Sequence, residues 1–417
     1  MRIVHFSTTK CAGGPYRLVS LLNKHSNLEV NLIDLKRWDI YPHDIIYEEE
    51  KEKAYELANN ADIIHFHNYY DQNSRFFTGL DFKKLKRKGV KFLCQYRSEP
   101  QTISLNTKAT VSEIINYDIP TIVIAQYPER FYPNSQVVPN AVPSNETLYM
   151  PGENNIEYDI LFSPTKSAGA WEKRWDTKGS SETLDIMNKL KKSNNCRVKL
   201  LKGKPVSEVL REKQKARIVL DDMVTGSYHM SGIEAICQAK AVLCYIDHRI
   251  LHVLQEISGA FQVPFVNVRL EEAYHVLKHL VENHDLTKEI GCEGRKWIDQ
   301  YWSEEIIVNH YVEIYNKLID NPFLVKRQES LRVERDHEKY FSLTLPDIIY
   351  NCRSERFLAS LSFRDKFIYL KRLHRKKMIK FRNRLGEKLK DLSLNYLPIP
   401  VIAFLKRIYS FLLRENN

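Results

Sequence analysis

The 417-residue sequence lacks any apolar run near the roughly 18 to 20 residues that a membrane-spanning helix needs. It also lacks a Cys-x-x-Cys pair: its seven cysteines are scattered, which predicts reduced thiols and no zinc site. Met1 and Arg2 lead directly into a short apolar segment at 3–6, which favours a strand over a signal peptide. We therefore expect a cytoplasmic protein without a leader or a spanning helix.

Two nucleotide-binding signatures are also missing. The sequence contains neither G-x-G-x-x-G nor the P-loop pattern G-x-x-x-x-G-K-[ST], which disfavours dinucleotide and ATP binding. A glycine pair, Gly13-Gly14, instead separates a predicted strand at 2–7 from a predicted helix, as at the start of a nucleotide-type half-sheet. Paired glycines let backbone N–H groups approach a phosphate, and a tight turn without a ligand is the alternative.

Positive charge is concentrated at one end of the chain. Residues 322–417 hold 22 Lys and Arg against 10 Asp and Glu, whereas the other 321 residues hold 41 against 42. The segment 364–390 carries 12 basic and 2 acidic residues among apolar ones, and a mostly apolar stretch follows at 401–413. We predict that 364–413 forms basic amphipathic helices on an anionic membrane. A basic helix on the protein body is an alternative; nucleic-acid binding is disfavoured because RNA-type aromatic motifs are missing.

Short apolar runs alternate with amphipathic ones along the first 320 residues, and this order predicts an α/β protein with parallel sheets. A rigid Pro-Asn turn near 139–143 and the polar segment 143–157 predict a boundary. We predict an N-terminal domain at 1–150, a second domain at 151–300, a closing helix at 301–325 and a basic tail at 326–417. Predicted strands lie at 2–7, 29–35, 61–68, 92–96, 121–125, 136–139, 159–162, 198–201, 217–220, 241–246 and 265–266. Predicted helices lie at 51–60, 183–191, 232–239, 271–284 and 297–319.

The stretch 216–246 carries the strongest chemical signal. It predicts a strand, a turn-rich loop around Gly226, a helix with Ser231 as its N-cap, and a second buried strand. The N-terminus of such a helix favours an anion, because its N–H groups are free and its dipole is positive there. Gly232 would begin the helix, and Glu234 lies one turn into it, where its carboxylate can accept hydrogen bonds from hydroxyls.

This stretch resembles the donor-nucleotide loop of GT-B-fold glycosyltransferases, most closely glycosyltransferase family 4. That family usually carries two glutamates eight positions apart, the second followed by Ala. Glu234-Ala235 matches the second, and Gly226 stands at the first. The resemblance implies two Rossmann-like domains facing a cleft, with Glu234 on the ribose of a nucleoside-diphosphate sugar and Ser231 and Gly232 near its phosphates.

Further donor-binding positions follow from the resemblance. The Gly13-Gly14 loop matches a family loop that faces the donor phosphates and the acceptor. The loop after 159–162 begins near Thr165 and leads to Lys178-Gly179, which matches a family Lys-Gly at the start of a helix. In the family an Arg and this Lys bind the diphosphate, and Arg174 is the predicted Arg.

The ends of two predicted N-terminal strands supply the remaining candidates. Asp62-Ile63-Ile64-His65-Phe66-His67 resembles a family motif at the end of a sheet strand. The next strand ends at Tyr96 and Arg97, where family members often have a histidine, so the catalytic role would fall to His67 or Arg97. A metal site at the two histidines is an alternative, but the sequence offers no evident third ligand.

The resulting hypothesis is a retaining glycosyltransferase. It would move a sugar from its nucleotide donor to a hydroxyl of a cell-surface glycan or lipid-linked acceptor. The sequence has no Asp-x-Asp, so Arg174 and Lys178 rather than a metal would stabilise the leaving diphosphate, and no cofactor is expected. The tail would hold the enzyme on the inner face of the cytoplasmic membrane. Alternatives are a sugar-nucleotide 2-epimerase or glycogen-type phosphorylase of the same fold, and a non-catalytic scaffold.

Overall fold

The computed structural model describes residues 1–326, except 9, 10, 12, 38–41, 69, 70, 72, 74, 75, 108, 127–131, 133, 153, 154, 166–168 and 171–176. By its internal contacts the chain divides into two units, Met1–Thr344 and Leu345–Asn417, and the described residues all belong to the first. Two sequence predictions, the Arg174 contact and the membrane-binding segment 364–413, therefore lie outside the described residues.

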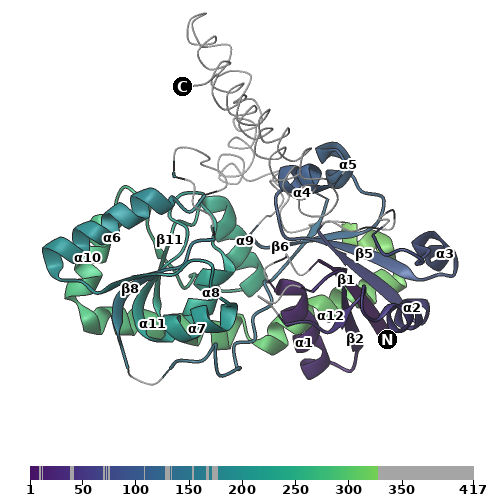
Figure 1. Ribbon diagram of the computed structural model, residues 1–417, viewed down its shortest axis with the longest axis horizontal. Helices are drawn as coiled ribbons and strands as arrows, with labels where there is room; N and C mark the ends of the chain where they lie inside the picture. The colour runs from purple at the N-terminus through teal and green to yellow at the C-terminus, as the bar shows by residue number, and fades with distance from the viewer. Residues whose placement is uncertain are drawn as a thin grey trace, which may run out of the picture. The chain divides into compact units, whose positions relative to one another are not determined.

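A seven-stranded parallel sheet forms what we call the N-terminal lobe (Figure 1). Its strand order is β3-β2-β1-β4-β5-β6-β7, a doubly wound arrangement in which the chain extends from β1 first to one side, through β2 and β3, and then to the other. Most of its strands are apolar runs that are buried along nearly their whole length, as expected when helices cover both faces. The strands are β1 (Arg2–Ser7), β2 (Glu29–Asp34), β3 (Ile45–Ile46), β4 (Ile63–His67), β5 (Lys91–Tyr96), β6 (Thr121–Ile124) and β7 (Gln136–Val138).

A five-stranded parallel sheet forms the C-terminal lobe, in the order β12-β11-β10-β8-β9. Strand β10 pairs with β8 on one side and β11 on the other, so the polar residues that follow it emerge at the middle of the sheet. The strands are β8 (Tyr158–Phe162), β9 (Val198–Leu200), β10 (Ala216–Leu220), β11 (Ala241–Cys244) and β12 (Val266–Asn267).

Helices connect the parallel strands in both lobes, and none of those described is long and apolar enough to cross a membrane. The helices of the N-terminal lobe are α1 (Gly14–His25), α2 (Lys51–Asn59), α3 (Phe82–Arg87), α4 (Pro100–Asn106) and α5 (Val111–Ile115). Those that follow are α6 (Ser180–Asn194), α7 (Val206–Gln214), α8 (Met230–Cys237), α9 (His248–Ser258), α10 (Ala273–Glu282), α11 (His284–Tyr301) and α12 (Glu304–Asp320), and the 3-10 helix η1 (Pro322–Lys326).

The predicted long helix at 297–319 is wrong. The structure has two helices there, α11 and α12, which are separated at Trp302 and Ser303. Ser303 is an N-cap whose hydroxyl accepts a hydrogen bond from the backbone N–H of Ile306, and two glutamates follow it in the first turn. The serine that follows Trp302 therefore marks the start of a helix, not the interior of one.

The predicted N-cap at Ser231 is also wrong. Helix α8 begins at Met230, and its N-cap is His229, which makes no side-chain capping bond. The backbone N–H of His229 instead donates to the carboxylate of Asp221, 2.6 Å away. A carboxylate from the preceding strand end thus replaces the local serine cap that sequence alone favours.

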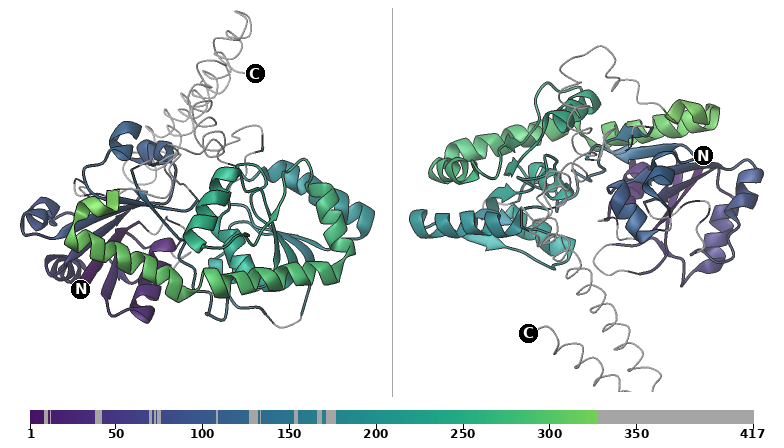
Figure 2. Two further views of the ribbon diagram at one scale, coloured as in Figure 1. Left: turned by 180° about the vertical axis from the view of Figure 1, so that it is seen from behind. Right: turned by 90° about the horizontal axis from the view of Figure 1, so that it is seen from above.

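Helix α12 packs against the N-terminal lobe although it follows the C-terminal sheet in sequence (Figure 2). The hydroxyls of Tyr315 and Tyr311 bond to His65 of β4 and Gln95 of β5, at 2.9 and 2.8 Å. At its start, the buried Glu304 accepts hydrogen bonds from Lys24 and His25 of α1. The chain therefore crosses between the lobes twice.

Candidate active site

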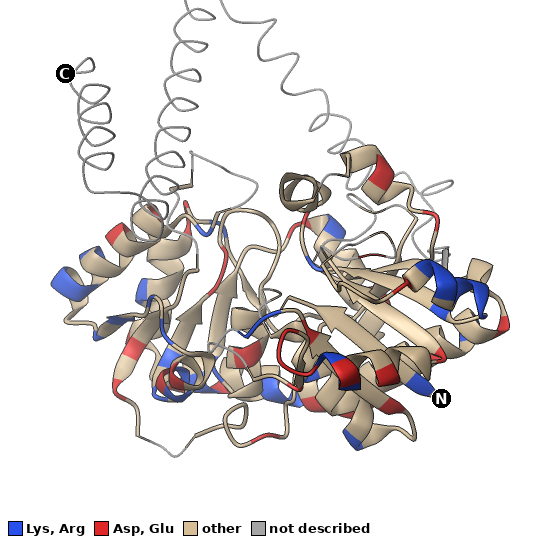
Figure 3. Cartoon of the chain, turned by 45° about the vertical axis from the view of Figure 1, so that its right-hand side comes forward, with Lys and Arg blue, Asp and Glu red and all other residues tan. Residues whose placement is uncertain are grey.

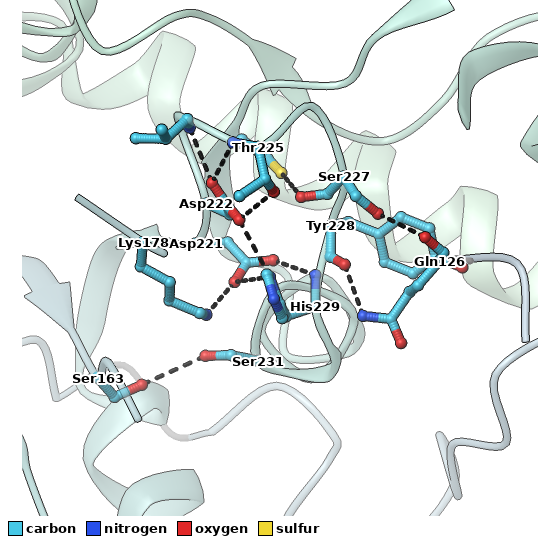
Figure 4. Close-up of polar contacts among 12 residues, drawn as sticks. Gln126, Ser163, Lys178, Asp221, Asp222, Thr225, Ser227, Tyr228, His229 and Ser231 are labelled. Atoms are coloured by element: carbon cyan, nitrogen blue, oxygen red, sulfur yellow. Dashed lines mark hydrogen bonds and ion pairs between the residues drawn. The ribbon is translucent and has the colours of Figure 1, made fainter. Parts of the chain in front are cut away.

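A buried hydrogen-bond network joins the two lobes at the loop after β10 (Figure 4). The side-chain amide of Gln126, which follows β6, donates to the backbone oxygen of Tyr228 at 2.6 Å, and the Ser227 hydroxyl donates to the Gln126 carbonyl. The Tyr228 hydroxyl donates to Asn140 at 2.6 Å, and Asn140 donates in turn to Gln126. The loop that resembles a donor loop is therefore fixed against the N-terminal lobe.

Glu234 makes a second connection between the lobes. Its carboxylate accepts a hydrogen bond from Lys213 of α7 at 2.7 Å and forms an ion pair with Arg17 of α1 at 3.4 Å. The Arg17 guanidinium also lies 3.4 Å from the Tyr149 hydroxyl. These side chains are almost fully buried, and one carboxylate is shared by two cations that come from different lobes.

Lys178 lies at the sheet edge of the C-terminal lobe, paired with Asp221 (Figure 4). Its Nζ atom is 2.5 Å from Asp221 Oδ1, and both side chains are buried. Burial alone would raise the pKa of Asp221, but Lys178 and His229 hold it below its usual value. Ser231, at the start of α8, shares a hydrogen bond with Ser163 after β8, so the ends of β8 and β10 and the N-terminus of α8 meet here.

Asp222, the neighbour of Asp221, closes the loop that follows β10. Its carboxylate accepts hydrogen bonds from the backbone of Val224 and Thr225 and from the Thr225 hydroxyl. Burial nevertheless raises the pKa of Asp222 to about 6, because these hydrogen bonds do not fully offset the desolvation of its charge. Two adjacent carboxyl groups at one strand end thus differ in charge state between about pH 4 and pH 6, where Asp222 is protonated and Asp221 is ionised.

The raised pKa of the Asp222 carboxyl group predicts that the stability of the fold depends on pH. Between about pH 4 and pH 6 the folded protein holds this proton and the unfolded chain does not, so stability falls as pH rises through that window, by about 3 kcal/mol in all. About half of this change is expected between pH 5 and pH 8. In urea unfolding, the stability of Asp222→Asn relative to the unsubstituted protein should therefore increase by about 1.5 kcal/mol from pH 5 to pH 8. An equal difference at both pH values would contradict the assignment.

Three histidines lie together under the carboxyl ends of β1 and β4. His5 and His65 are register partners on these adjacent strands, and His67 is two residues further along β4. All three are fully buried, and burial lowers their pKa values, that of His5 to about 3. The rings are therefore neutral at physiological pH.

The hydrogen bonds of this cluster fix the tautomers. Arg97 lies 3.5 Å from His67 Nδ1, and a guanidinium can only donate, so Nδ1 accepts and Nε2 carries the proton. His67 Nε2 then donates to His5 Nδ1 at 2.9 Å, and His5 Nε2 donates to the Tyr315 hydroxyl at 3.2 Å. The Tyr315 hydroxyl donates a hydrogen bond to His65 Nδ1 at 2.9 Å. A chain of neutral donors thus runs from Arg97 to helix α12.

A metal ion fits this cluster less well than the hydrogen-bond chain does. One ligand nitrogen of each histidine lies within 4.8 Å of the others, which corrects the expectation that a third ligand is missing. However, the described residues bring no carboxylate to the cluster, and the Arg97 guanidinium adjoins His67. A buried cation would therefore be left without a compensating charge. Metal independence stays a prediction.

The structure brings most predicted site residues to the carboxyl ends of the two sheets. His67 and Arg97 lie at the ends of β4 and β5, beside the Gly13-Gly14 turn. Lys178, Ser231 and Gly232 gather at the end of β10, where a Cβ on Gly232 would lie 2.6 Å from Asp221 Oδ2. Glu234 faces the N-terminal lobe, and Thr165 is exposed after β8.

Sequence analysis missed the residues that hold these groups in place. Asp221 and Asp222 could have been found, because polar residues after a buried strand lie at the edge where sites of α/β proteins form. The remaining partners lie far away in sequence and carry no local signal: Arg17, Lys213, Gln95, Tyr311 and Tyr315.

Neither a protein-family model nor a curated protein matches the chain. Solved structures do match. An alpha-glucosyltransferase in complex with UDP has a TM-score of 0.53 at 12% identity, over 76% of this chain and 100% of that chain. An alpha-glucosyltransferase with UDP-glucose and DNA containing an abasic site has 0.51 at 12% identity, over 75% and 98%. HepE of Anabaena with UDP-glucose has 0.50 at 12% identity, over 76% and 100%.

At this level of identity the similarity establishes the fold. The chain has the GT-B fold, with two Rossmann-like lobes, which confirms the predicted fold class. Two of these three structures are alpha-glucosyltransferases, and all three were solved with UDP or UDP-glucose. Membership of glycosyltransferase family 4 stays a prediction.

Proposed function

We propose that this protein is a glycosyltransferase that moves a sugar from a nucleoside-diphosphate sugar to an acceptor hydroxyl. The observation that carries this proposal is the meeting of Lys178, Ser231 and Gly232 with the N-terminus of α8 at the end of β10. In a GT-B fold this places a cation and a helix N-terminus at the carboxyl edge of one sheet, where open α/β sheets bind ligands. UDP-sugars are the first donors to test, because the matching structures hold UDP or UDP-glucose.

In this proposal the donor diphosphate binds to the C-terminal lobe. Negative charge develops on the departing phosphate as the anomeric C–O bond breaks, and preorganised donors there lower the barrier. Lys178, the N–H groups near Ser231 and Arg174, which lies outside the described residues, supply those donors. Glu234 accepts from the ribose hydroxyls while Lys213 holds its carboxylate. Thr165 completes the donor side of the site.

The N-terminal lobe faces the acceptor in this proposal. Gly13 and Gly14 have no side chains, so the sugar end of the donor can approach the backbone at the start of α1. Arg97 is the side chain of this lobe that meets the substrate. His67 acts through Arg97, because both of its ring nitrogens are bonded within the protein. Retention of anomeric configuration and a glycan or lipid-linked acceptor remain part of the proposal.

The assay for this function is donor-dependent release of a nucleoside diphosphate. UDP-, GDP- and ADP-sugars are incubated with the full chain, with and without a mixed panel of glycan and glycolipid acceptors. Release that needs an acceptor, together with transfer of label to it, is the expected result. Donor hydrolysis to the 2-epimer would favour the epimerase alternative, and a need for phosphate the phosphorylase. Nucleotide binding without turnover would favour a scaffold.

We also propose that 364–413 binds an anionic membrane surface. Its support is the sequence alone: 12 basic residues within 364–390, each contributing about 1 kcal/mol near such a surface. The full chain should float with vesicles containing phosphatidylglycerol but not with neutral vesicles. A full-length variant with Lys371, Arg372, Lys376 and Lys377 changed to glutamine should float less. Equal flotation of this variant and the parent protein would contradict the proposal that 364–413 binds the membrane.

A further inference from the structure

Among the described residues, four cations lie near the sheet ends that form the candidate site, and three of them contact a carboxylate. Lys178 pairs with Asp221, while Arg17 and Lys213 share Glu234, as described above. Arg97 differs: in the described part of the chain no Asp or Glu lies within ion-pair distance of its guanidinium. A half-buried charge of this kind is costly unless something neutralises it, so its presence at a site points to a ligand.

Neutral groups orient the Arg97 guanidinium without cancelling its charge. Its Nη2 atom donates to Gln95 Oε1 at 3.1 Å, and its Nε atom donates to His67. Gln95 is held by the Tyr311 hydroxyl, and His67 by the histidine–tyrosine chain that ends on α12. Each of these partners is uncharged, because burial keeps the histidines neutral and the tyrosines protonated. The protein thus fixes the direction of a positive charge that no carboxylate in the described part of the chain compensates.

The guanidinium lies against the start of helix α1. A Cβ atom on Gly14 would lie 2.3 Å from Arg97 Nη1, so the close approach requires glycine there. Helix α1 has Gly13 as its N-cap, no side-chain capping bond and no acidic residue in its first turn. Among the described residues, the positive end of a 12-residue helix and a guanidinium therefore meet without an anion between them. Planar N–H donors of this kind match the oxygens of a phosphate or a carboxylate.

We propose that Arg97 and the Gly13-Gly14 turn form an oxyanion site of the N-terminal lobe, and that the acceptor carries the phosphate or carboxylate that binds there. This inference rests on the proposed function and names the chemical class of its acceptor. The donor diphosphate is a separate ligand, held by Lys178 and the start of α8 in the other lobe. The enzyme would accordingly select an anionic acceptor over its uncharged counterpart.

The first test measures binding of inorganic phosphate to the full-length protein that has been saturated with UDP, by calorimetric titration. UDP occupies the donor site, so any phosphate bound reports a second site. The parent protein should bind phosphate at millimolar concentration or below. Arg97→Gln should weaken this binding at least tenfold while changing UDP affinity less than about twofold. Absence of phosphate binding in the parent protein would overturn the proposal, as would an equal loss of UDP and phosphate affinity.

A second variant keeps the arginine and removes only its net charge. Gln95→Glu has nearly the same shape and places a carboxylate at the atom that accepts from Arg97 Nη2. It should abolish phosphate binding as fully as Arg97→Gln does, whereas a purely structural role for Arg97 predicts no loss. Thermal unfolding of both variants establishes that they fold.

The matched control is Arg87→Gln on α3, a helix of the same lobe that carries exposed Lys and Arg residues; Lys and Arg positions are coloured blue in Figure 3. It removes the same charge from the surface and should leave phosphate binding within about twofold of the parent value. A loss as large as that of Arg97→Gln would mean that the general field of the lobe, not a site, attracts phosphate.

Turnover separates the acceptor from the donor. With a working sugar nucleotide, glucose 6-phosphate is compared with glucose, and glucuronic acid with glucose. Arg97→Gln should lower kcat/KM for the anionic member of each pair at least tenfold more than for the neutral one. A uniform loss would assign Arg97 to the donor and overturn the proposal. If UDP does not bind but phosphate still binds through Arg97, the oxyanion site stands and the proposed function fails.

Discussion

Lys178→Met is expected to lower the free energy of unfolding by about 3 kcal/mol and to reduce turnover at least tenfold. Lys178 and Asp221 are both buried, with 2.5 Å between Nζ and Oδ1. Removing the lysine leaves the Asp221 carboxylate without its compensating charge inside the protein. The same substitution removes a cation from the proposed diphosphate site, so stability and catalysis should fall together. Urea unfolding and nucleoside-diphosphate release measure the two losses.

A double substitution separates these two effects. Lys178→Met combined with Asp221→Asn removes both charges and should recover most of the lost stability, because no unpaired charge remains. Turnover should stay low, because the cation is still absent. Recovery of turnover in the double variant would limit Lys178 to a structural role. A single variant as stable as the parent would show that the ion pair contributes nothing.

Glu234→Gln is expected to cost about 3 kcal/mol or more, because it leaves two buried cations, Arg17 and Lys213, without their shared carboxylate. Since Arg17 lies in the N-terminal lobe and Lys213 in the C-terminal lobe, the substitution should also loosen the contact between them. Nucleotide affinity should fall at least tenfold if Glu234 binds the ribose, because an amide is a weaker acceptor than a carboxylate. Denaturant unfolding and calorimetric titration with UDP provide both numbers.

The control for Glu234 is Glu208→Gln. Glu208 pairs with Lys204 at 2.9 Å, but both side chains are exposed, and such pairs contribute about 0 to 1 kcal/mol. Its substitution should therefore change neither stability nor UDP affinity measurably. If Glu234→Gln lowers stability while UDP affinity is unchanged, Glu234 joins the lobes and does not bind the ribose.

Local sequence pattern was enough to predict most of the strands. Strands β1, β2 and β8 were placed to within one residue, because each is an apolar run bounded by polar or turn-forming residues. The break between α11 and α12 was missed, since Trp302 and Ile306 continue an apolar helical pattern across it. From sequence alone, a serine that caps a helix cannot be told from a serine inside a helix. The two differ in backbone conformation, which only the folded structure shows.

The residues of the candidate site also fall into two groups: those that local sequence pattern predicts and those that it does not. Gly13, Gly14, Lys178 and Glu234 could be proposed because each stands beside a strand end or helix start that local pattern reveals. Their partners could not, because the contacts span long stretches of chain: 217 residues separate Arg17 from Glu234, and 310 separate His5 from Tyr315. Only the packed fold determines which charges are neutralised. The absence of a carboxylate partner for Arg97 among the described residues is therefore a property that no sequence pattern carries.

Helix α12 has a consequence for how the protein is made. It supplies Tyr311 and Tyr315 to the first sheet, yet it is among the last described elements to be synthesised. While the ribosome is still translating the second half of the chain, the face of β4 and β5 that α12 covers stays open. A nascent chain would need to keep that apolar surface from aggregating until Asp320 has left the exit tunnel.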